Sequence, residues 1–179
     1  MSDDLTVEAP STEGRLPAGW SWSQLGDECQ INPRRPAISR LADAPTTFVP
    51  MAAVAEEGRG IDGSEIRPYA DVAKGYTYFE EGDVLFAKIT PCMQNGKHAI
   101  TRNLIDGMGL GSTEFHIVWS GSNVTPEWIH LFLIQPWVLS EAMAHFTVQW
   151  VNNGYRSHTW PSFGCHCPRF PSSGPSRRC

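Results

Sequence analysis

The sequence has few basic residues and lacks any long apolar run. Its 14 Lys and Arg stand against 19 Asp and Glu, for a formal net charge of -5 at pH 7. A free-standing nucleic-acid-binding domain normally carries a basic surface, so this balance argues against binding by phosphate attraction alone. No stretch approaches the roughly 18 apolar residues of a membrane span, and Met1–Pro10 is acidic, unlike a signal peptide. We therefore expect a cytoplasmic protein without a membrane segment.

Paired cysteines are also lacking. The chain has five cysteines, an odd number, and Cys165, Cys167 and Cys179 crowd its C-terminal end. This distribution predicts reduced thiols and no disulfide framework. The 179 residues are 41% hydrophobic and 18% charged, which fits one globular domain with its own core.

The chain divides into three segments. Residues 1–15 are acidic and lack periodicity, so we expect a disordered acidic tail. Residues 16–147 form the expected domain, which Leu16–Gly26 enters in an extended conformation because apolar and polar residues alternate there. Residues 148–179 are rich in Pro, Gly, Ser, Arg and Cys, and we expect no packed structure in them.

Four segments have the composition of β-strands. Thr46–Val54 contains Pro50, which predicts an edge or bent strand. Tyr76–Phe79 and Asp83–Ile89 are expected as two strands joined by a turn over residues 80–82, and Phe115–Trp119 is expected as another. The turn formers between residues 90 and 111 predict a long structured loop.

Helix signals follow the last of these strands. Thr125, Pro126 and Glu127 supply an N-cap hydroxyl, a proline at the first helical position and an acid in the first turn. Pro136 is expected to end or kink this helix, and a second helix is expected from Trp137 to about Phe146. The prediction is a mixed α/β (α+β) fold with a mainly β core, a C-terminal helical pair and a disordered tail.

Two polar loops carry the residue types that recognise base edges and phosphates. In the run Glu81–Lys97 an apolar strand leads directly into a polar loop with a glycine, and a second loop covers Gly109–Glu114. Amides, lysines, hydroxyls and carboxylates read base edges, and glycine lets a backbone approach closely. The candidate DNA-binding residues are Lys88, Thr90, Gln94, Asn95, Gly96, Lys97, Gly111, Ser112, Thr113 and Glu114. We expect the two loops to meet on one exposed face. On composition alone, Asn-Gly and Gly-Ser-Thr are more typical of ordinary turns and loops than of DNA binding.

Longer motifs favour the recognition hypothesis. The segments concerned are Leu16–Gly26, Ile31–Arg34, Phe48–Met51, Lys74–Tyr76, Gly82–Lys97 and Gly109–His116. Together they resemble the target-recognition domain of type I restriction-modification specificity subunits, over residues 16 to about 147. This resemblance implies a DNA-binding domain that has no catalytic activity and needs no cofactor.

The resemblance also implies partners. In that family each of two recognition domains, held apart by helical spacers, reads half of a split site in double-stranded DNA. Modification (methyltransferase) subunits use S-adenosylmethionine, and restriction subunits use ATP. Such partners can supply phosphate contacts that an acidic domain lacks. This chain departs from the pattern because it has one recognition domain and no spacer helix.

Other functions fit the sequence less well. A thiol-dependent hydrolase or nuclease would use Cys92 as nucleophile and His98 or His116 as base, but no helix start follows Cys92 to lower its pKa. Glu114 and His116 lie two apart on an expected strand and can in principle chelate a metal. Cys165, His166 and Cys167 lack the spacing of a zinc site. We expect neither a thiol enzyme nor a metal protein.

The end of the chain carries a separate hypothesis. The resemblance stops at Met143–Thr147, where relatives continue with a Gly-Gln-Gln-Arg-Val-Pro motif. Codons for Val148–Arg156 can be chosen so that one restored base yields this motif, and Phe170–Cys179 yields a second family motif in the same frame. We therefore expect residues 148–179 to be frameshifted and the specificity subunit to be truncated. A natural Pro- and Ser-rich tail is the alternative, and the gene sequence distinguishes the two.

Overall fold

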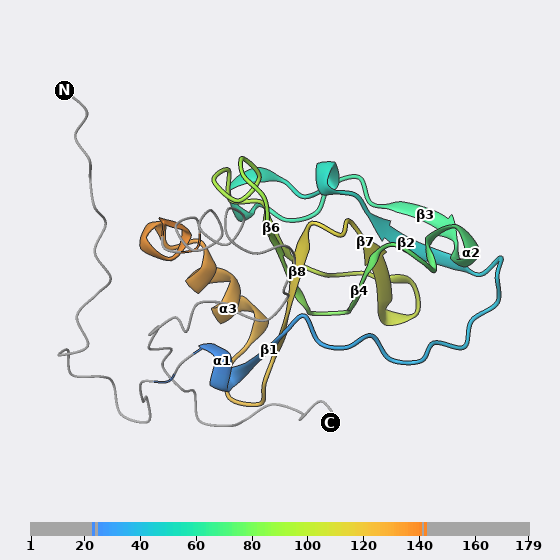
Figure 1. Cartoon of the computed structure of the whole chain (residues 1–179), viewed down its shortest axis with the longest axis horizontal. Coiled ribbons are helices and arrows are strands. Elements are labelled where there is room, and N and C mark those ends of the chain that lie inside the picture. Colours follow the sequence, from blue (N-terminus) through green and yellow to red (C-terminus); the bar gives the residue numbers. More distant parts are fainter. Residues whose placement is uncertain (1–22, 24, 141, 143–179) are drawn as a thin grey trace, which may run out of the picture.

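The computed structural model describes residues 23, 25–140 and 142, and the structural statements below refer to these residues. They form two four-stranded sheets with few helices (Figure 1). The first sheet has the order β1-β8-β5-β6 and the second β3-β2-β7-β4. The strands of the first sheet are β1 (Cys29–Ile31), β8 (Phe115–Ser120), β5 (Val84–Ala87) and β6 (His98–Ile100). Those of the second are β3 (Glu65–Pro68), β2 (Pro45–Val49), β7 (Met108–Gly111) and β4 (Thr77–Glu80). The predicted mixed α+β class is confirmed.

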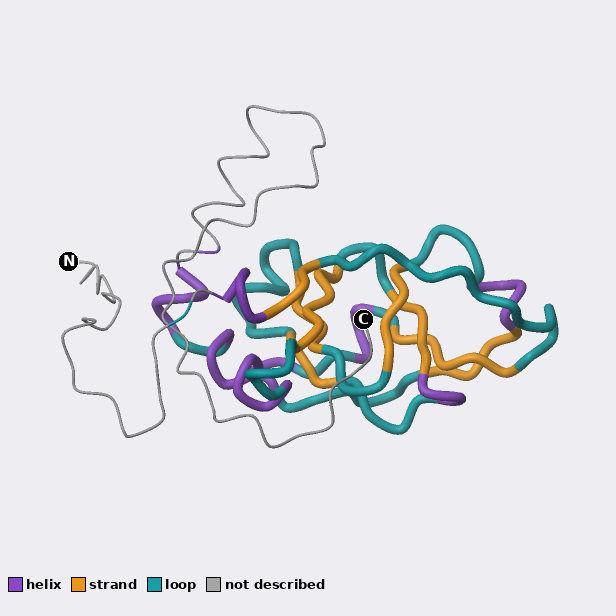
Figure 2. The backbone as a smooth tube through the Cα atoms, turned by 90° about the horizontal axis from the view of Figure 1, so that it is seen from below, coloured by secondary structure: helices purple, strands orange, loops and turns teal. Residues whose placement is uncertain are grey.

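Helices cover one face of the first sheet. They are α1 (Leu25–Glu28), α3 (Pro126–Leu133) and a further helical stretch over residues 136–140. Figure 2 shows these helices gathered at one end of the fold, beside the strands. Ile129, Phe132 and Leu133 of α3 share one face and are buried against Val84 and Phe86 of the sheet. Apolar spacing along the helix thus predicted the packed face correctly.

The two sheets pack against each other through the other face of the first sheet. This second buried cluster contains Val49, Phe79, Leu85, Phe115 and Ile117. On the far side of the second sheet, a third cluster lies under α2 (Tyr69–Val72) and contains Phe48, Val72, Met108 and Leu110. Each sheet therefore buries both faces at least in part, which explains why β5 is an unbroken apolar run.

The predicted strands differ from the structure in some details. β4 and β5 do form on either side of residues 80–82, but they belong to different sheets and do not pair. β2 is an interior strand, antiparallel to β3 and parallel to β7, so the edge position predicted from Pro50 is wrong. Pro50 directly follows the last residue of β2 and is the N-cap of a 3₁₀ turn, η1 (Met51–Ala53).

The long loop predicted between residues 90 and 111 contains two strands, β6 and β7. β6 is only three residues long, and β7 is Met-Gly-Leu-Gly, whose glycines resemble turn formers. The extended entry predicted over Leu16–Gly26 is also wrong at its end, because Leu25 and Gly26 lie in α1. The rest of that entry lies outside the described residues, apart from Ser23, and so do the tails 1–15 and 148–179.

The helical pair begins as predicted. The Thr125 side chain caps α3 by accepting a hydrogen bond of 3.2 Å from Trp128 N, and Pro126 occupies the first turn. α3 ends at Leu133, and residues 136–140 and 142 are helical, with Val138 and Ala142 buried. Met143 and the remainder of the second helix lie outside the described residues. No described helix has the length and apolar character needed to cross a membrane.

We expect Thr125→Ala to lower the free energy of unfolding by about 1 kcal/mol, because it leaves the Trp128 amide without its capping oxygen. Urea unfolding at neutral pH measures this, with Ser122→Ala in the preceding exposed loop as the control. Equal stability of the two variants would show that the cap contributes nothing.

Candidate nucleic-acid interface

The two predicted loops meet at one end of the first sheet. Beyond the last pair of the β5–β8 ladder, Lys88 N donates to Glu114 O at 2.8 Å. The Lys88 ammonium reaches further along the same turn and donates to Thr113 O at 2.9 Å. The loop that follows β5 is thereby joined to the turn between β7 and β8. We call Lys88 together with Ser112, Thr113 and Glu114 the reading turn.

Lys88 is half-buried, and burial lowers the pKa of its ammonium, with Glu114 acting in the opposite direction. The turn itself is closed by local bonds: Ser112 Oγ accepts from Glu114 N at 3.2 Å, and Ser112 N donates to Val49 O at 3.2 Å. Thr113 is exposed at the tip. A lysine of restricted freedom therefore supports a turn that presents a hydroxyl to the outside.

Asn32 forms hydrogen bonds with β8, the strand that follows the reading turn. Asn32 has a left-handed backbone (φ 49°), and its amide bonds His116 Nδ1 at 2.8 Å and accepts from Ile117 N at 3.1 Å. Burial, and to a lesser degree Lys88, lowers the pKa of His116 to about 3. His116 is therefore neutral at physiological pH. The sequence identified Asn32 only within the family resemblance, since its partner lies 84 residues away.

The rest of the first loop turns toward another part of the fold. Asn95 donates from its side-chain amide to Glu56 Oε1 at 2.7 Å, in the 3₁₀ turn η2 (Glu56–Gly58). Lys97 donates from Nζ to Val54 O at 2.8 Å. Gln94 and Thr90 are exposed, and the Thr90–Pro91 peptide bond is cis. The ten candidate residues thus fall into two groups, and only the reading turn joins both predicted loops.

The two glycines of the candidate set are buried. Gly96 has φ 63°, and a Cβ there would lie 3.3 Å from Glu57 Cα. Gly111 lies in β7, where a Cβ would lie 2.6 Å from Val49 O. Both positions need glycine for packing within the fold. Burial leaves the backbones of both glycines little surface to present to DNA.

The described residues do not provide the geometry that a thiol enzyme or a metal site needs. Neither ring nitrogen of His98 has a hydrogen-bond partner there, so Cys92 and His98 form no nucleophile–base pair. Within the same residues no group of three or more His, Cys, Asp or Glu side chains is placed to hold a metal. Asn32 bonds His116 Nδ1, and Glu114 and His116 belong to no metal-holding group of three or more such side chains among the described residues. The cluster Cys165–Cys167 lies outside the described residues.

Comparison with known proteins gives consistent relatives. No protein-family model matches the sequence. The chain is 36% identical over 137 residues to the type I restriction enzyme EcoEI specificity subunit of Escherichia coli, covering 76% of this chain and 23% of that protein. It is 38% identical over 109 residues to the EcoAI specificity subunit of the same organism, covering 61% of this chain and 18% of that protein. The chain therefore spans about a fifth of these relatives' length.

Solved structures share the fold. One is the HsdS subunit from Thermoanaerobacter tengcongensis, with a TM-score of 0.56 and 19% identity over 90% of this chain and 40% of that one. Another comes from work on complex assembly and conformational transition of the type I R-M system, with a TM-score of 0.57 and 19% identity over 88% of this chain and 40% of that one. The two-sheet fold is thus shared with these solved structures. By sequence, the chain is related to the specificity subunits of type I restriction enzymes.

Proposed function

We propose that this chain is a sequence-specific DNA target-recognition domain of a type I restriction-modification specificity subunit, with no catalytic activity of its own. The relationship to EcoEI and EcoAI specificity subunits supports the class. The observation that carries the proposal is the Lys88–Thr113 contact, because it holds two polar loops together at one exposed turn. A turn fixed in this way costs little ordering entropy when it meets a base edge.

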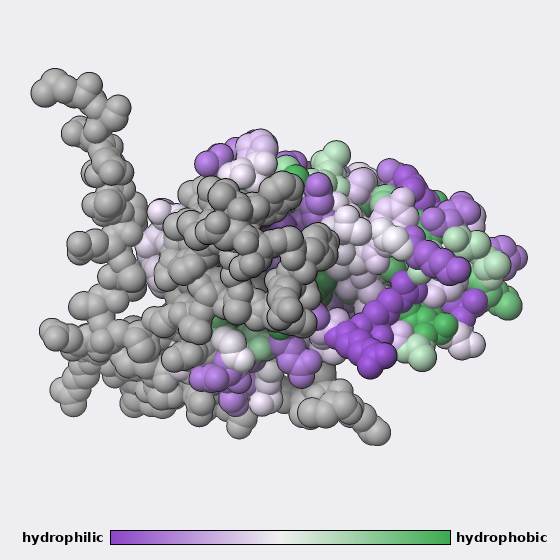
Figure 3. Space-filling model, in the orientation of Figure 1, coloured by the Kyte–Doolittle hydropathy of each residue, from purple (hydrophilic) through white to green (hydrophobic). Residues whose placement is uncertain are grey.

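In this proposal the reading turn makes the base contacts. The Thr113 hydroxyl donates to or accepts from a base edge, the Glu114 carboxylate accepts from cytosine N4, and Lys88 contacts guanine or a phosphate. Thr90 and Gln94 are exposed and contribute at the margin. Asn95 and Lys97 already bond Glu56 and Val54, so they act mainly by holding the loop. In Figure 3 the described residues on the right, over β2, β3 and α2, show hydrophilic side chains with separate hydrophobic areas between them.

The expected partners are double-stranded DNA and the modification (methyltransferase) and restriction subunits of the same system, in the cytoplasm. The net charge of -5 makes the chain depend on these subunits for most phosphate contacts. We also propose residues 16–147 as the recognition domain and residues 148–179 as a frameshifted segment. Sequencing the gene tests the frameshift: codons that cannot give Gly-Gln-Gln-Arg-Val-Pro in the shifted frame would contradict it.

DNA selection tests the proposed function. The purified chain, at low salt where phosphate attraction is strongest, is used to select duplexes from a random library. We expect one short motif to be enriched. Thr113→Val removes the hydroxyl at nearly constant volume and should reduce discrimination at one position about tenfold, in line with roughly 1–3 kcal/mol per mismatched base.

Ser64→Ala is the control, since it removes an exposed loop hydroxyl near β3. It should select the same motif as the wild type with the same discrimination. Selection of no motif by the wild-type chain would overturn the proposed function. A wild-type motif retained unchanged by Thr113→Val would instead overturn the role of the reading turn.

A further inference from the structure

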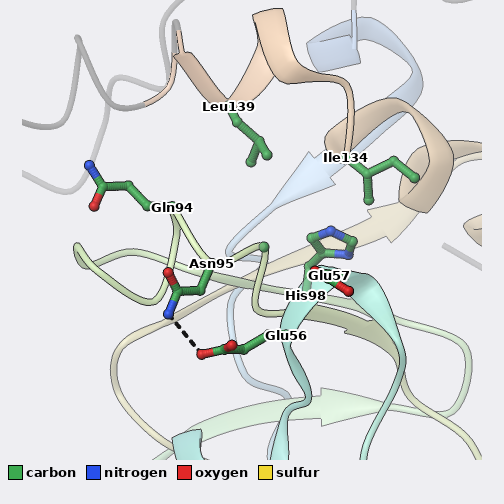
Figure 4. A pocket seen from close by; sticks show the side chains of 8 residues that line it. Glu56, Glu57, Gln94, Asn95, His98, Ile134 and Leu139 are labelled. Atoms are coloured by element: carbon green, nitrogen blue, oxygen red, sulfur yellow. Dashed lines mark hydrogen bonds between the residues drawn. The ribbon is translucent and has the colours of Figure 1, made fainter.

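A second site lies away from the reading turn, in a pocket of about 520 Å³ between the helical end of the fold and η2 (Figure 4). Three distant segments line it. Ile134 and Leu139, from the end of α3 and the helical stretch after it, form an apolar wall. Across the space lie polar groups of η2 and of the loop before β6. These are Glu56, Glu57, Gln94, Asn95 and Gly96, with His98 at the edge of the pocket.

The pocket is built before any ligand arrives. Glu57 N donates to Asn95 O and Gly58 N to Gly96 O, each at 2.9 Å, so η2 is fastened to the loop by two backbone bonds. The Asn95 amide adds its bond to Glu56 Oε1, drawn as the dashed line in Figure 4. These bonds fix η2 and the Glu56 carboxylate without further ordering, while the exposed Glu57 carboxylate lies 3.9 Å from Arg59 Nε.

His98 leaves hydrogen-bonding capacity unused at this wall. Its side chain is fully buried (0% exposed), and neither ring nitrogen has a hydrogen-bond partner among the described residues. Its ring makes an edge-on contact with that of His130, with centroids 4.6 Å apart. Buried polar groups are normally satisfied, so an orphaned imidazole beside a pocket is an indication that a polar ligand completes the site.

The lining selects the charge of that ligand. Among the described residues, the lining contains two carboxylates, two amides and one imidazole and no Lys or Arg, and the Arg59 guanidinium lies 3.9 Å from the Glu57 carboxylate. A phosphate would be repelled, so the pocket is not an extension of the DNA-reading surface. A metal ion is excluded by the donor set, since no group of three or more His, Cys, Asp or Glu among the described residues is placed to hold one. A cation on an aliphatic stem fits both the acidic side and the apolar wall.

We propose that this pocket receives an arginine side chain from a partner protein subunit. The methylene stem packs against Ile134 and Leu139, and the guanidinium donates to the carboxylates of Glu56 and Glu57. Arginine fits better than lysine because its five planar donors also serve the amide oxygens of the wall and one imidazole nitrogen. The pocket is therefore a protein-docking site, and it shares Gln94 with the margin of the proposed DNA contact. This inference goes beyond DNA recognition and does not require it.

A small-molecule titration tests the chemistry. We expect n-butylguanidinium chloride to shift the ring resonances of His98 in NMR spectra with a saturable dependence, and n-butylammonium to bind more weakly. The double variant Glu56→Gln/Glu57→Gln removes both charges, while the amide oxygen introduced at position 56 can still accept from Asn95, so the wall is kept. It should weaken guanidinium binding at least tenfold. Asp62→Asn, an exposed acid outside the pocket, is the control and should bind as the wild type does.

Association with a partner tests the source of the arginine. The methyltransferase subunit of the same system, titrated onto the full chain, should bind the double variant at least tenfold more weakly than the Asp62→Asn chain. Non-saturating shifts with n-butylguanidinium, or equal partner affinity of both variants, would overturn the proposal. If the double variant lost DNA selection but kept its affinity for the partner, the proposal would also be contradicted, since the pocket would then bind DNA. Failure of the wild-type chain to select DNA bears only on the proposed function.

Discussion

Gly111→Ala is expected to lower the free energy of unfolding by about 3 kcal/mol, at the upper end of what overpacking a buried site costs. The added Cβ would lie 2.6 Å from Val49 O and 3.0 Å from the ring of Phe79. The oxygen is part of the β2 backbone and cannot rotate away, so β2 and β7 must separate. Because β7 is an interior strand of the second sheet, this separation also disturbs the contact between the two sheets.

Gly26→Ala is the matched control. Gly26 lies in α1, is exposed, and has nothing within 4 Å of an added Cβ, so the change should leave stability within about 0.5 kcal/mol or raise it slightly. Urea unfolding followed by tryptophan fluorescence measures both variants. If Gly111→Ala unfolds at the same urea concentration as Gly26→Ala, the close packing of β7 on β2 is wrong. DNA selection by any folded Gly111→Ala protein then shows whether the residue also matters for recognition.

Local signals in the sequence predicted the elements that local chemistry controls. The cap and proline of α3 set its start, and the apolar runs around Leu85 and Ile117 predicted β5 and β8. β7 was not predicted because its two glycines are needed by neighbours in space, Phe79 and Val49, which no local pattern reveals. The sequence predicted β4 and β5 as two strands joined by one turn, but not that they lie in different sheets. Their separation into two sheets depends on which faces pack together.

The candidate site was predicted only in part, because some of its contacts join residues far apart in the sequence. The family resemblance selected the segments of Lys88 and Thr113, but not that the lysine ammonium would support the threonine carbonyl 25 residues away. Nothing in the sequence around Asn95 indicated that its amide bonds Glu56, 39 residues earlier. Contacts of this separation follow from sheet order and loop path. The division of the loop residues between a reading turn and an acidic pocket is therefore a property of the fold.

Acid is expected to destabilise the domain through His98. Burial lowers the pKa of His98 to about 4, with a smaller contribution from the nearby His130, against an ordinary value of 6.5. The unfolded chain therefore binds a proton at a higher pH than the folded chain does. Stability from this residue is fully present above pH 6.5 and is lost as the pH falls toward 4. The expected loss is about 2 kcal/mol between roughly pH 7.5 and pH 5 and about 3 kcal/mol in total.

Other histidines act in the same direction. Burial also lowers the pKa of His130, against hydrogen bonds to the backbone of Gly58 and His98 and the charge of Glu127, which raise it. His116, with its pKa lowered to about 3, adds to the loss in the same window. The wild-type domain should therefore lose more stability than His98 alone accounts for. Urea unfolding at pH 7.5, 6.5, 5.5 and 5.0 gives the dependence.

His98→Gln isolates the contribution of this residue, because glutamine carries no charge at any of these pH values. The quantity compared is the change in free energy of unfolding between pH 7.5 and pH 5, so a constant cost of the substitution cancels. We expect this change to shrink by about 2 kcal/mol in the variant. An identical pH dependence in wild type and His98→Gln would show that His98 is not buried in its neutral form. The inference that its ring nitrogens await a ligand at the pocket wall would then be wrong as well.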